Sequence, residues 1–291
     1  MDILTNYTFQ IVALGSVLLA VAAAPVGAFS VYKGQSLIGD AIGHSTFPGI
    51  ILAYMAFATR SPVILLAGAI LAGAASYALI QLAHRDKRLG LDANLAIFLS
   101  GFFGLGMALK SFIQGNPDYV GASQAGLGTY IFGQAAYMLE ADVLLIAAIS
   151  ALVLTLLLLF YKELKLFVFD AEYAEVVGLP CHLLNLLLLV MTIAVIGIGI
   201  KAVGAILISS FLIIPCVAAN QWSNNFARVL LLSSLIGAVS ALVGTYISTL
   251  EQGMSTGPSI ILVASLIAFF SIVFGTKGIL GSVLKRRRTH G

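Results

Sequence analysis

The sequence predicts an all-α membrane protein, a polytopic helical bundle of about nine transmembrane helices (eight to ten). Of the 291 residues, 60% are hydrophobic and only 9% are charged, and the mean hydropathy is +1.06. An average soluble domain is about one-quarter charged, so this composition cannot build a surface that faces water. The apolar residues come in blocks of roughly 20, the length that a helix needs to cross the bilayer core.

Nine apolar blocks follow one another along the chain. The first ten residues lack the basic segment of a cleaved signal peptide, so the first block is expected to be a retained span. The break between the sixth and seventh blocks is short, and these two could form one long, kinked or re-entrant element around Gly204 and Pro215. The blocks lie near residues 9–30, 37–58, 62–83, 92–111, 139–161, 182–200, 203–219, 227–249 and 258–276.

Basic residues predict the orientation in the membrane, because loops rich in lysine and arginine stay in the cytoplasm. This rule places the C-terminus inside and, with nine spans, the N-terminus outside. The nearly uncharged loop 111–138 and the loop at Glu251 then lie outside, while Arg60, Lys110 and Lys201 are exceptions. The basic residues expected inside are Lys33, Arg85, Lys87, Arg88, Lys162, Lys165, Arg228 and those of 285–288.

Several sequence motifs are missing, and each absence removes a class of function. No GxxxxGK[ST] loop occurs, so the chain cannot cradle ATP in the usual way. No GxSxG or HExxH motif occurs either, so the sequence gives no support for a hydrolase. Cys181 and Cys216 lie far apart and form no CxxC pair, so they predict neither a disulfide framework nor a thiolate metal cluster.

The segment 34–49 contains an acidic and a basic residue at the start of the second apolar block. Asp40 and His44 are four residues apart, so they share one face of a helix. Ionisable groups within a span usually face a bundle interior or a water-filled path. A carboxylate beside an imidazole suits manganese, iron or zinc, whereas magnesium and calcium favour oxygen ligands.

One chain supplies only these two metal ligands, but two copies facing each other would supply two Asp and two His. A conducting site must release its ion, so a sparse ligand set suits transport. The alternative is that Asp40 caps the helix, with Gly39 at the helix start and His44 pairing one turn later. Gly43, Ser45 and Gly49 favour the first interpretation, because small residues keep a pore-lining helix slim.

A short amphipathic helix is predicted after the fifth block. Asp170 is a suitable N-cap, residues 171–177 can form two turns, Gly178 can end them and Pro180 prevents continuation. The polar face carries Glu172 and Glu175. Helices that lie on a bilayer are usually basic on their polar face, so docking against a protein partner is favoured over a membrane-surface role.

Residues 204–220 predict an apolar helix that contains Pro215. Proline there removes a backbone hydrogen bond and indicates a kink or a hinge. Lys201, just before this helix, is expected to extend its ammonium group to the interface.

The sequence resembles the manganese/zinc/iron ABC permease family, also described as the ABC-3 type of metal importer. Residues 35–49, with the element Gly-Asp-(x)3-His-(x)3-Pro-Gly, resemble the second-helix signature of that family. Three further blocks match in order: residues 130–133, residues 169–180, and residues 203–215. The resemblance covers nearly the whole chain.

The resemblance implies one transmembrane permease domain over residues 1–291 with a fold like that of type II ABC importers. It also implies a multi-pass protein of a prokaryotic inner or plasma membrane that is a transporter and not an enzyme. The expected partners are a second permease chain, usually identical, two cytoplasmic ATPase subunits that alone bind ATP, and an extracytoplasmic metal-binding protein. No permanent cofactor and no nucleic-acid partner are expected.

The resemblance also assigns roles to residues. Asp40 and His44 match the pore pair that interacts with the metal, and ATP hydrolysis in the partner would open the path alternately to each side. Residues expected to pack the pore or act as hinges are Gly39, Gly43, Pro48, Gly49, Gly204 and Pro215. Residues expected to couple to the ATPase, within a helix at about 170–179, are Asp170, Ala171, Glu172, Tyr173, Glu175, Gly178 and Leu179.

Three alternative functions stay open. A permease for an iron-siderophore or cobalamin must pass a large organic ligand, which an inward Asp–His pair on a narrow helix disfavours. A gradient-driven secondary metal transporter should show an internal repeat with paired broken helices, and none is evident. An intramembrane enzyme or receptor would have no catalytic group beyond Asp40 and His44.

Overall fold

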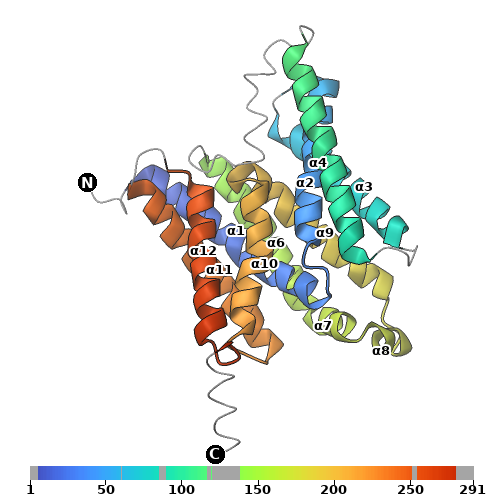
Figure 1. The fold of residues 1–291 in the computed structure, drawn as a ribbon, viewed down its shortest axis with the longest axis vertical. Coiled ribbons are helices and arrows are strands. Elements are labelled where there is room, and N and C mark those ends of the chain that lie inside the picture. The colour runs from blue at the N-terminus through green and yellow to red at the C-terminus, as the bar shows by residue number, and fades with distance from the viewer. Residues whose placement is uncertain are drawn as a thin grey trace, which may run out of the picture.

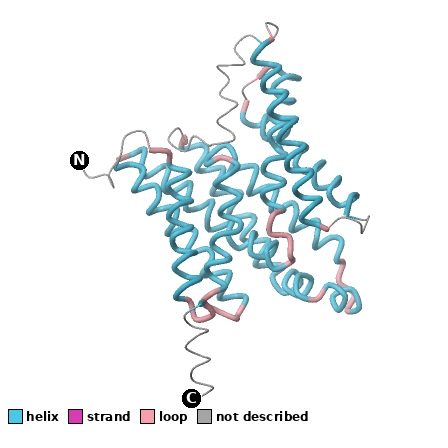
Figure 2. The backbone as a smooth tube through the Cα atoms, in the orientation of Figure 1, coloured by secondary structure: helices cyan, strands magenta, loops and turns pink. Residues whose placement is uncertain are grey.

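The computed structural model describes the chain as an assembly of α-helices joined by short loops (Figures 1 and 2). It describes residues 6–59, 61–84, 90–116, 119, 138–250 and 254–279. Within these ranges the helices are α1 (Tyr7–Tyr32), α2 (Ile38–Phe57), α3 (Pro62–His84), α4 (Leu91–Gly115), α6 (Glu140–Leu159), α7 (Tyr161–Phe169), α8 (Ala171–Val176), α9 (Cys181–Val203), α10 (Ala205–Asn220), α11 (Phe226–Leu250) and α12 (Thr256–Phe274).

Seven of the described helices are long and apolar enough to cross a membrane, namely α1, α3, α4, α6, α9, α11 and α12. The all-helical membrane architecture is therefore confirmed, while the expected count of about nine spans is not. Each apolar block nevertheless coincides with a helix. The two remaining blocks correspond to α2 and to α10, which is only 16 residues long.

Several helix ends lie where the sequence signals placed them. Asp170 caps α8 by accepting a hydrogen bond from the Tyr173 N–H at 2.9 Å. Gly178 follows α8 with φ = +87°, a conformation that glycine adopts without steric cost. Gly204, at φ = +86°, separates α9 from α10, so the sixth and seventh blocks are two helices and not one continuous element.

Two expectations about the connecting segments differ from the structure. Residues 161–169 were expected to begin a loop but form the amphipathic helix α7, because Leu164 and Phe167 are buried on one of its faces. The loop expected from residue 111 starts later, since α4 continues to Gly115. Several other expected features lie outside the described residues. They are most of the rest of this loop, including the block at 130–133, and also Glu251, the basic residues at 85–88 and 285–288, and the side chain of Lys201.

The helices form two packed groups that α9 and α10 connect (Figure 1). In one group α1 packs against α10, α11 and α6, and α12 packs against α10 and α11. In the other, α3 and α4 pack against α2. Large leucine and phenylalanine side chains stay exposed on the outer faces, as expected for helices that contact lipid tails.

Glycine allows α2 and α3 to cross at backbone contact. A Cβ atom added to Gly49 would lie 2.1 Å from the Gly68 carbonyl oxygen, and one added to Gly68 would lie 2.4 Å from the Gly49 carbonyl oxygen. No side chain fits between the two backbones there. This contact fixes α2, which carries the candidate site, against α3.

An aromatic cluster joins α1, α7 and α11 at the end of the molecule where α8 lies. Its rings are Phe29, Tyr32, Tyr161, Phe169 and Phe226, with centroids 4.9 to 6.3 Å apart. Edge-to-face and stacked pairs of this kind add to the burial energy. The cluster therefore holds α7, and with it α8, against the ends of α1 and α11 that carry these rings.

Candidate functional site

Asp40 and His44 lie on one face of α2, as their spacing predicts. The His44 Nε2 atom is 3.4 Å from an Asp40 carboxylate oxygen, and the side chains are 18% and 31% exposed, respectively. Leu37, not Asp40, occupies the N-cap position of α2, and no side chain caps this helix end. The interpretation of Asp40 as an N-cap is therefore wrong, and its carboxylate is available to His44 and to other partners.

Ser209 of α10 is a second partner of Asp40. Its hydroxyl lies close to the carboxylate and donates a hydrogen bond to the Ala205 carbonyl oxygen at 3.0 Å. A hydroxyl has one hydrogen to donate, so the carboxylate and the carbonyl compete for it. Ser209 is buried, and it brings a second oxygen-bearing side chain to the Asp40–His44 pair.

Phe103 of α4 covers the opposite side of His44. The two ring centroids are 5.1 Å apart with an interplanar angle of 83°, an edge-to-face arrangement. Phe47 of α2 also lies next to the Phe103 ring, with 6.2 Å between the two centroids. The candidate site thus lies between α10 on one side and α4 on the other.

One chain does not complete a metal centre within the described residues. No group of three or more His, Cys, Asp or Glu side chains comes close enough to hold a metal ion there. A carboxylate and an imidazole are both good ligands for first-row transition metals. Two ligands at a partly buried position suit transient binding, or a site shared with another copy of the chain.

The glycine and proline residues around the pair lie at helix crossings. A Cβ atom on Gly39 would lie 2.5 Å from a Leu212 methyl group of α10, and one on Gly43 would lie 3.3 Å from the Ser209 hydroxyl oxygen. Pro48 lies within α2 against Gly106 of α4. Small residues thus let α10 and α4 approach α2 closely on either side of the pair.

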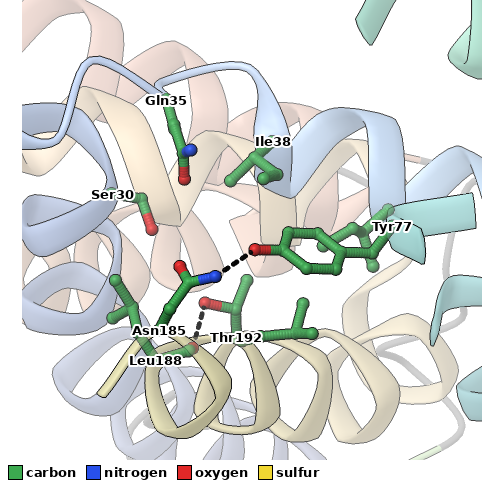
Figure 3. A pocket seen from close by; sticks show the side chains of 9 residues that line it. Ser30, Gln35, Ile38, Tyr77, Asn185, Leu188 and Thr192 are labelled. Atoms are coloured by element: carbon green, nitrogen blue, oxygen red, sulfur yellow. Dashed lines mark hydrogen bonds between the residues drawn. The ribbon is translucent and has the colours of Figure 1, made fainter. Parts of the chain in front are cut away.

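A polar cluster occupies the neighbouring face of α2 (Figure 3). Asn185 of α9 donates a hydrogen bond to the Tyr77 hydroxyl at 2.9 Å, and Gln81 donates to the same oxygen at 2.6 Å. Ser30, Gln35 and Thr192 complete the polar lining of a cavity of about 10 Å³. This is about the space that one water molecule needs.

Lys33, just after α1, closes this cluster toward α7. Its ammonium group donates a hydrogen bond to the Asn185 side-chain oxygen and lies 4.8 Å from the centre of the Phe167 ring. Burial lowers the pKa of Lys33 to about 8, because desolvation disfavours the charged form. The positive charge makes this cluster a poor cation site and a better structural junction between α1, α3, α7 and α9.

The predicted coupling segment forms α8 and its flanking turns, which lie next to α7 at one end of the molecule (Figure 1). Ala174 is fully buried, whereas Glu172, Tyr173 and Glu175 are exposed and Leu179 is partly buried. Tyr173 and Val176 are 54% and 84% exposed. The exposed surface of α8 is both acidic and apolar, and α8 itself is held in place by α7 and α9. Such a surface can bind a protein partner.

An apolar cavity of about 420 Å³ lies between α3, α6 and α9 and is a poor candidate for metal. Most of its lining is aliphatic, including Leu65, Ile146 and Ile198. The one carboxylate among its lining residues, Asp142, accepts a hydrogen bond from the Leu139 N–H at the start of α6. This lining therefore offers a metal ion few polar partners.

Sequence reasoning missed Ser209 and Phe103. Each comes from a helix far along the chain from residue 40, and neither has a spacing that relates it to Asp40 or His44. The only signal for Ser209 was its place in the 203–215 block. Nothing in the sequence distinguished Phe103 from the neighbouring Phe102.

Comparisons with known proteins agree with this architecture. The chain is 39% identical over 289 residues to the zinc transport system membrane protein TroC of Treponema pallidum, covering 99% of this chain and 96% of that protein. It is 38% identical to the manganese transport system membrane protein MntC of Bacillus subtilis, covering 96% of this chain and 65% of that protein.

The fold is also similar to a solved structure, PsaBC from Streptococcus pneumoniae in complex with Fab. The TM-score is 0.81 with 26% sequence identity, and the match covers 94% of both chains. The ABC 3 transport family matches residues 5–275, nearly the whole sequence. Since the family match covers nearly the whole sequence and the fold agrees over the same length, the chain belongs to the ABC 3 transport family.

Proposed function

We propose that this chain is the membrane-spanning permease subunit of an ATP-driven importer for divalent transition metal ions, namely manganese, zinc or iron. The observation that carries the proposal is the Asp40–His44 pair, 3.4 Å apart on α2, within a chain of the ABC 3 transport family. Relatives named for zinc and for manganese support the class of substrate.

The metal path would lie where Asp40 and His44 meet their counterparts in a second permease chain. Two copies would supply two carboxylates and two imidazoles, enough for transient binding. The narrow approach of α4 and α10 to this face supports a bare ion as cargo over a siderophore or cobalamin. In the working complex the path would open alternately to each side.

The motor would be two ATPase subunits that bind α8 and its flanking turns, residues 170–179. The chain carries no phosphate-binding loop motif, so ATP would bind only to those partners. An extracytoplasmic metal-binding protein would deliver the ion. The whole chain would act as one permease domain of about nine spans in the cell membrane, its C-terminus and the α8 end in the cytoplasm.

Uptake of radioactive manganese and zinc tests this proposal in cells that contain the permease with its partner proteins. Asp40→Ala and His44→Ala should each reduce the ATP-dependent uptake rate about tenfold or more, because each removes a ligand. Membrane abundance and binding of the ATPase should stay unchanged. Normal uptake in both variants, or transport by the chain without any ATPase, would contradict the proposal.

A further inference from the structure

Phe103 contacts one of the two proposed metal ligands without being able to bind metal itself. Its ring meets the His44 ring edge-to-face, at 5.1 Å between centroids and 83° between planes. Among the described residues it is the one aromatic side chain paired with His44. A phenyl ring has no lone pair to offer, so any role in metal transport acts through the imidazole.

The backbone of α4 holds Phe103 in this place. One turn further along α4, a Cβ atom added to Gly106 would lie 2.5 Å from the Phe47 ring and 3.1 Å from Pro48. The α4 helix therefore touches α2 directly beside His44. Most other side chains of α4 are exposed, so its contact with α2 and α3 sets its position.

The His44 ring needs an external constraint if it is to bind metal together with Asp40. Rotation about χ2 of histidine is broad and roughly two-fold. Asp40 contacts the ring at Nε2 only, and a single hydrogen-bonding contact does not fix the ring plane. An edge-to-face neighbour restricts that plane, and such pairs correspond to about a three- to tenfold bias.

We infer that Phe103 is a positioning residue, which holds the His44 imidazole in the orientation that presents Nε2 beside the Asp40 carboxylate. The inference rests on the proposed function, because it assigns Phe103 a role in binding the transported metal. It also links α4 to the site: a displacement of α4 from α2 would release the imidazole.

Two measurements on the assembled transporter, with ATPase and binding protein present, test this role. The first is the rate of manganese and zinc uptake. The second is the rate at which diethyl pyrocarbonate modifies His44 in metal-free buffer, followed by mass spectrometry. His182 is exposed and serves as the internal standard in the same molecule.

Phe103→Leu should lower the uptake rate about three- to tenfold and raise the modification rate of His44 at least about threefold relative to His182. Phe103→Met fills a similar volume without a ring and should behave like Phe103→Leu. Phe103→Tyr keeps the ring and should restore both values. Phe112→Leu is the matched control, because Phe112 lies on the same helix, 55% exposed, and its aromatic partner is Tyr119.

The outcomes separate this inference from the proposed function. If His44→Ala abolishes uptake while Phe103→Leu and Phe103→Met leave it normal, the proposed function stands and the positioning role is wrong. Faster modification of His44 with unchanged uptake also overturns the role, since the ring would cover His44 without serving transport. Faster uptake would identify Phe103 as an obstruction. Normal uptake in His44→Ala would overturn the proposed function itself.

Discussion

At the scale of single residues, the chemistry of the site depends on which partners reach Asp40. The carboxylate contacts His44 along the same helix and Ser209 from another helix. The first contact follows from an i,i+4 spacing. The second exists only because α10 packs against α2 at Gly39 and Gly43. Ser209 therefore belongs to the site by tertiary contact alone.

Ser209→Ala should reduce metal uptake about two- to tenfold without reducing the abundance of the protein in the membrane. The reason is that the Ser209 hydroxyl lies close to the Asp40 carboxylate, and removing a polar partner of a charged group changes how that group is presented. Ser233→Ala is the matched control, because that buried hydroxyl hydrogen-bonds to the Val229 carbonyl of its own helix, at 2.7 Å. Equal uptake in the two variants would remove Ser209 from the site.

At the scale of helices, α2 is held by small residues on three sides: Gly68 of α3, Gly106 of α4 and the Ser209 region of α10. Lipid tails are as apolar as the helix surfaces, so close packing rather than hydrophobic burial holds such helices together. The consequence is that the geometry of Asp40 and His44 depends on backbone contacts made next to the pair and one to two turns further along α2.

Gly49→Ala should lower the apparent melting temperature of the purified protein by several degrees. The added Cβ atom would lie 2.1 Å from the Gly68 carbonyl oxygen, and forcing the helices apart typically costs about 1–3 kcal/mol. Gly101→Ala of α4 serves as the control, since nothing lies within 4 Å of a Cβ atom there. A melting temperature unchanged by Gly49→Ala would contradict the close crossing of α2 and α3.

At the scale of the whole molecule, Lys33 connects helices of both packed groups. Its ammonium group is bound to Asn185 of α9 and faces Phe167 of α7, while Asn185 in turn binds Tyr77 of α3. Burial in the folded state disfavours the charged amine of Lys33, which lowers its pKa to about 8. Protonation of Lys33 therefore opposes folding below about pH 8, and this opposition fades as the pH rises toward 10.5.

Thermal unfolding at pH 7 and pH 9.5 should show this effect when wild type is compared with Lys33→Met. The melting temperature of the wild type should rise relative to that of the variant as the pH increases, because only the wild type loses the buried charge. Lys277→Met, which removes an exposed lysine, reports pH effects that do not depend on burial. A constant difference between wild type and Lys33→Met at the two pH values would show that Lys33 is solvated.

The sequence by itself determined the membrane class, nine helical blocks, the cap at Asp170 and the shared face of Asp40 and His44, whereas the break at Gly204 was decided by the structure. Each feature that the sequence determined follows from composition or from spacings of four residues or fewer, which local helix geometry turns into structure. Only the tertiary structure placed Ser209 beside Asp40, Phe103 over His44 and Lys33 within the polar cluster. These contacts join helices that are distant in the chain. Their geometry depends on where glycines let two helix backbones come close, and the sequence has no periodic pattern that predicts which helices do so.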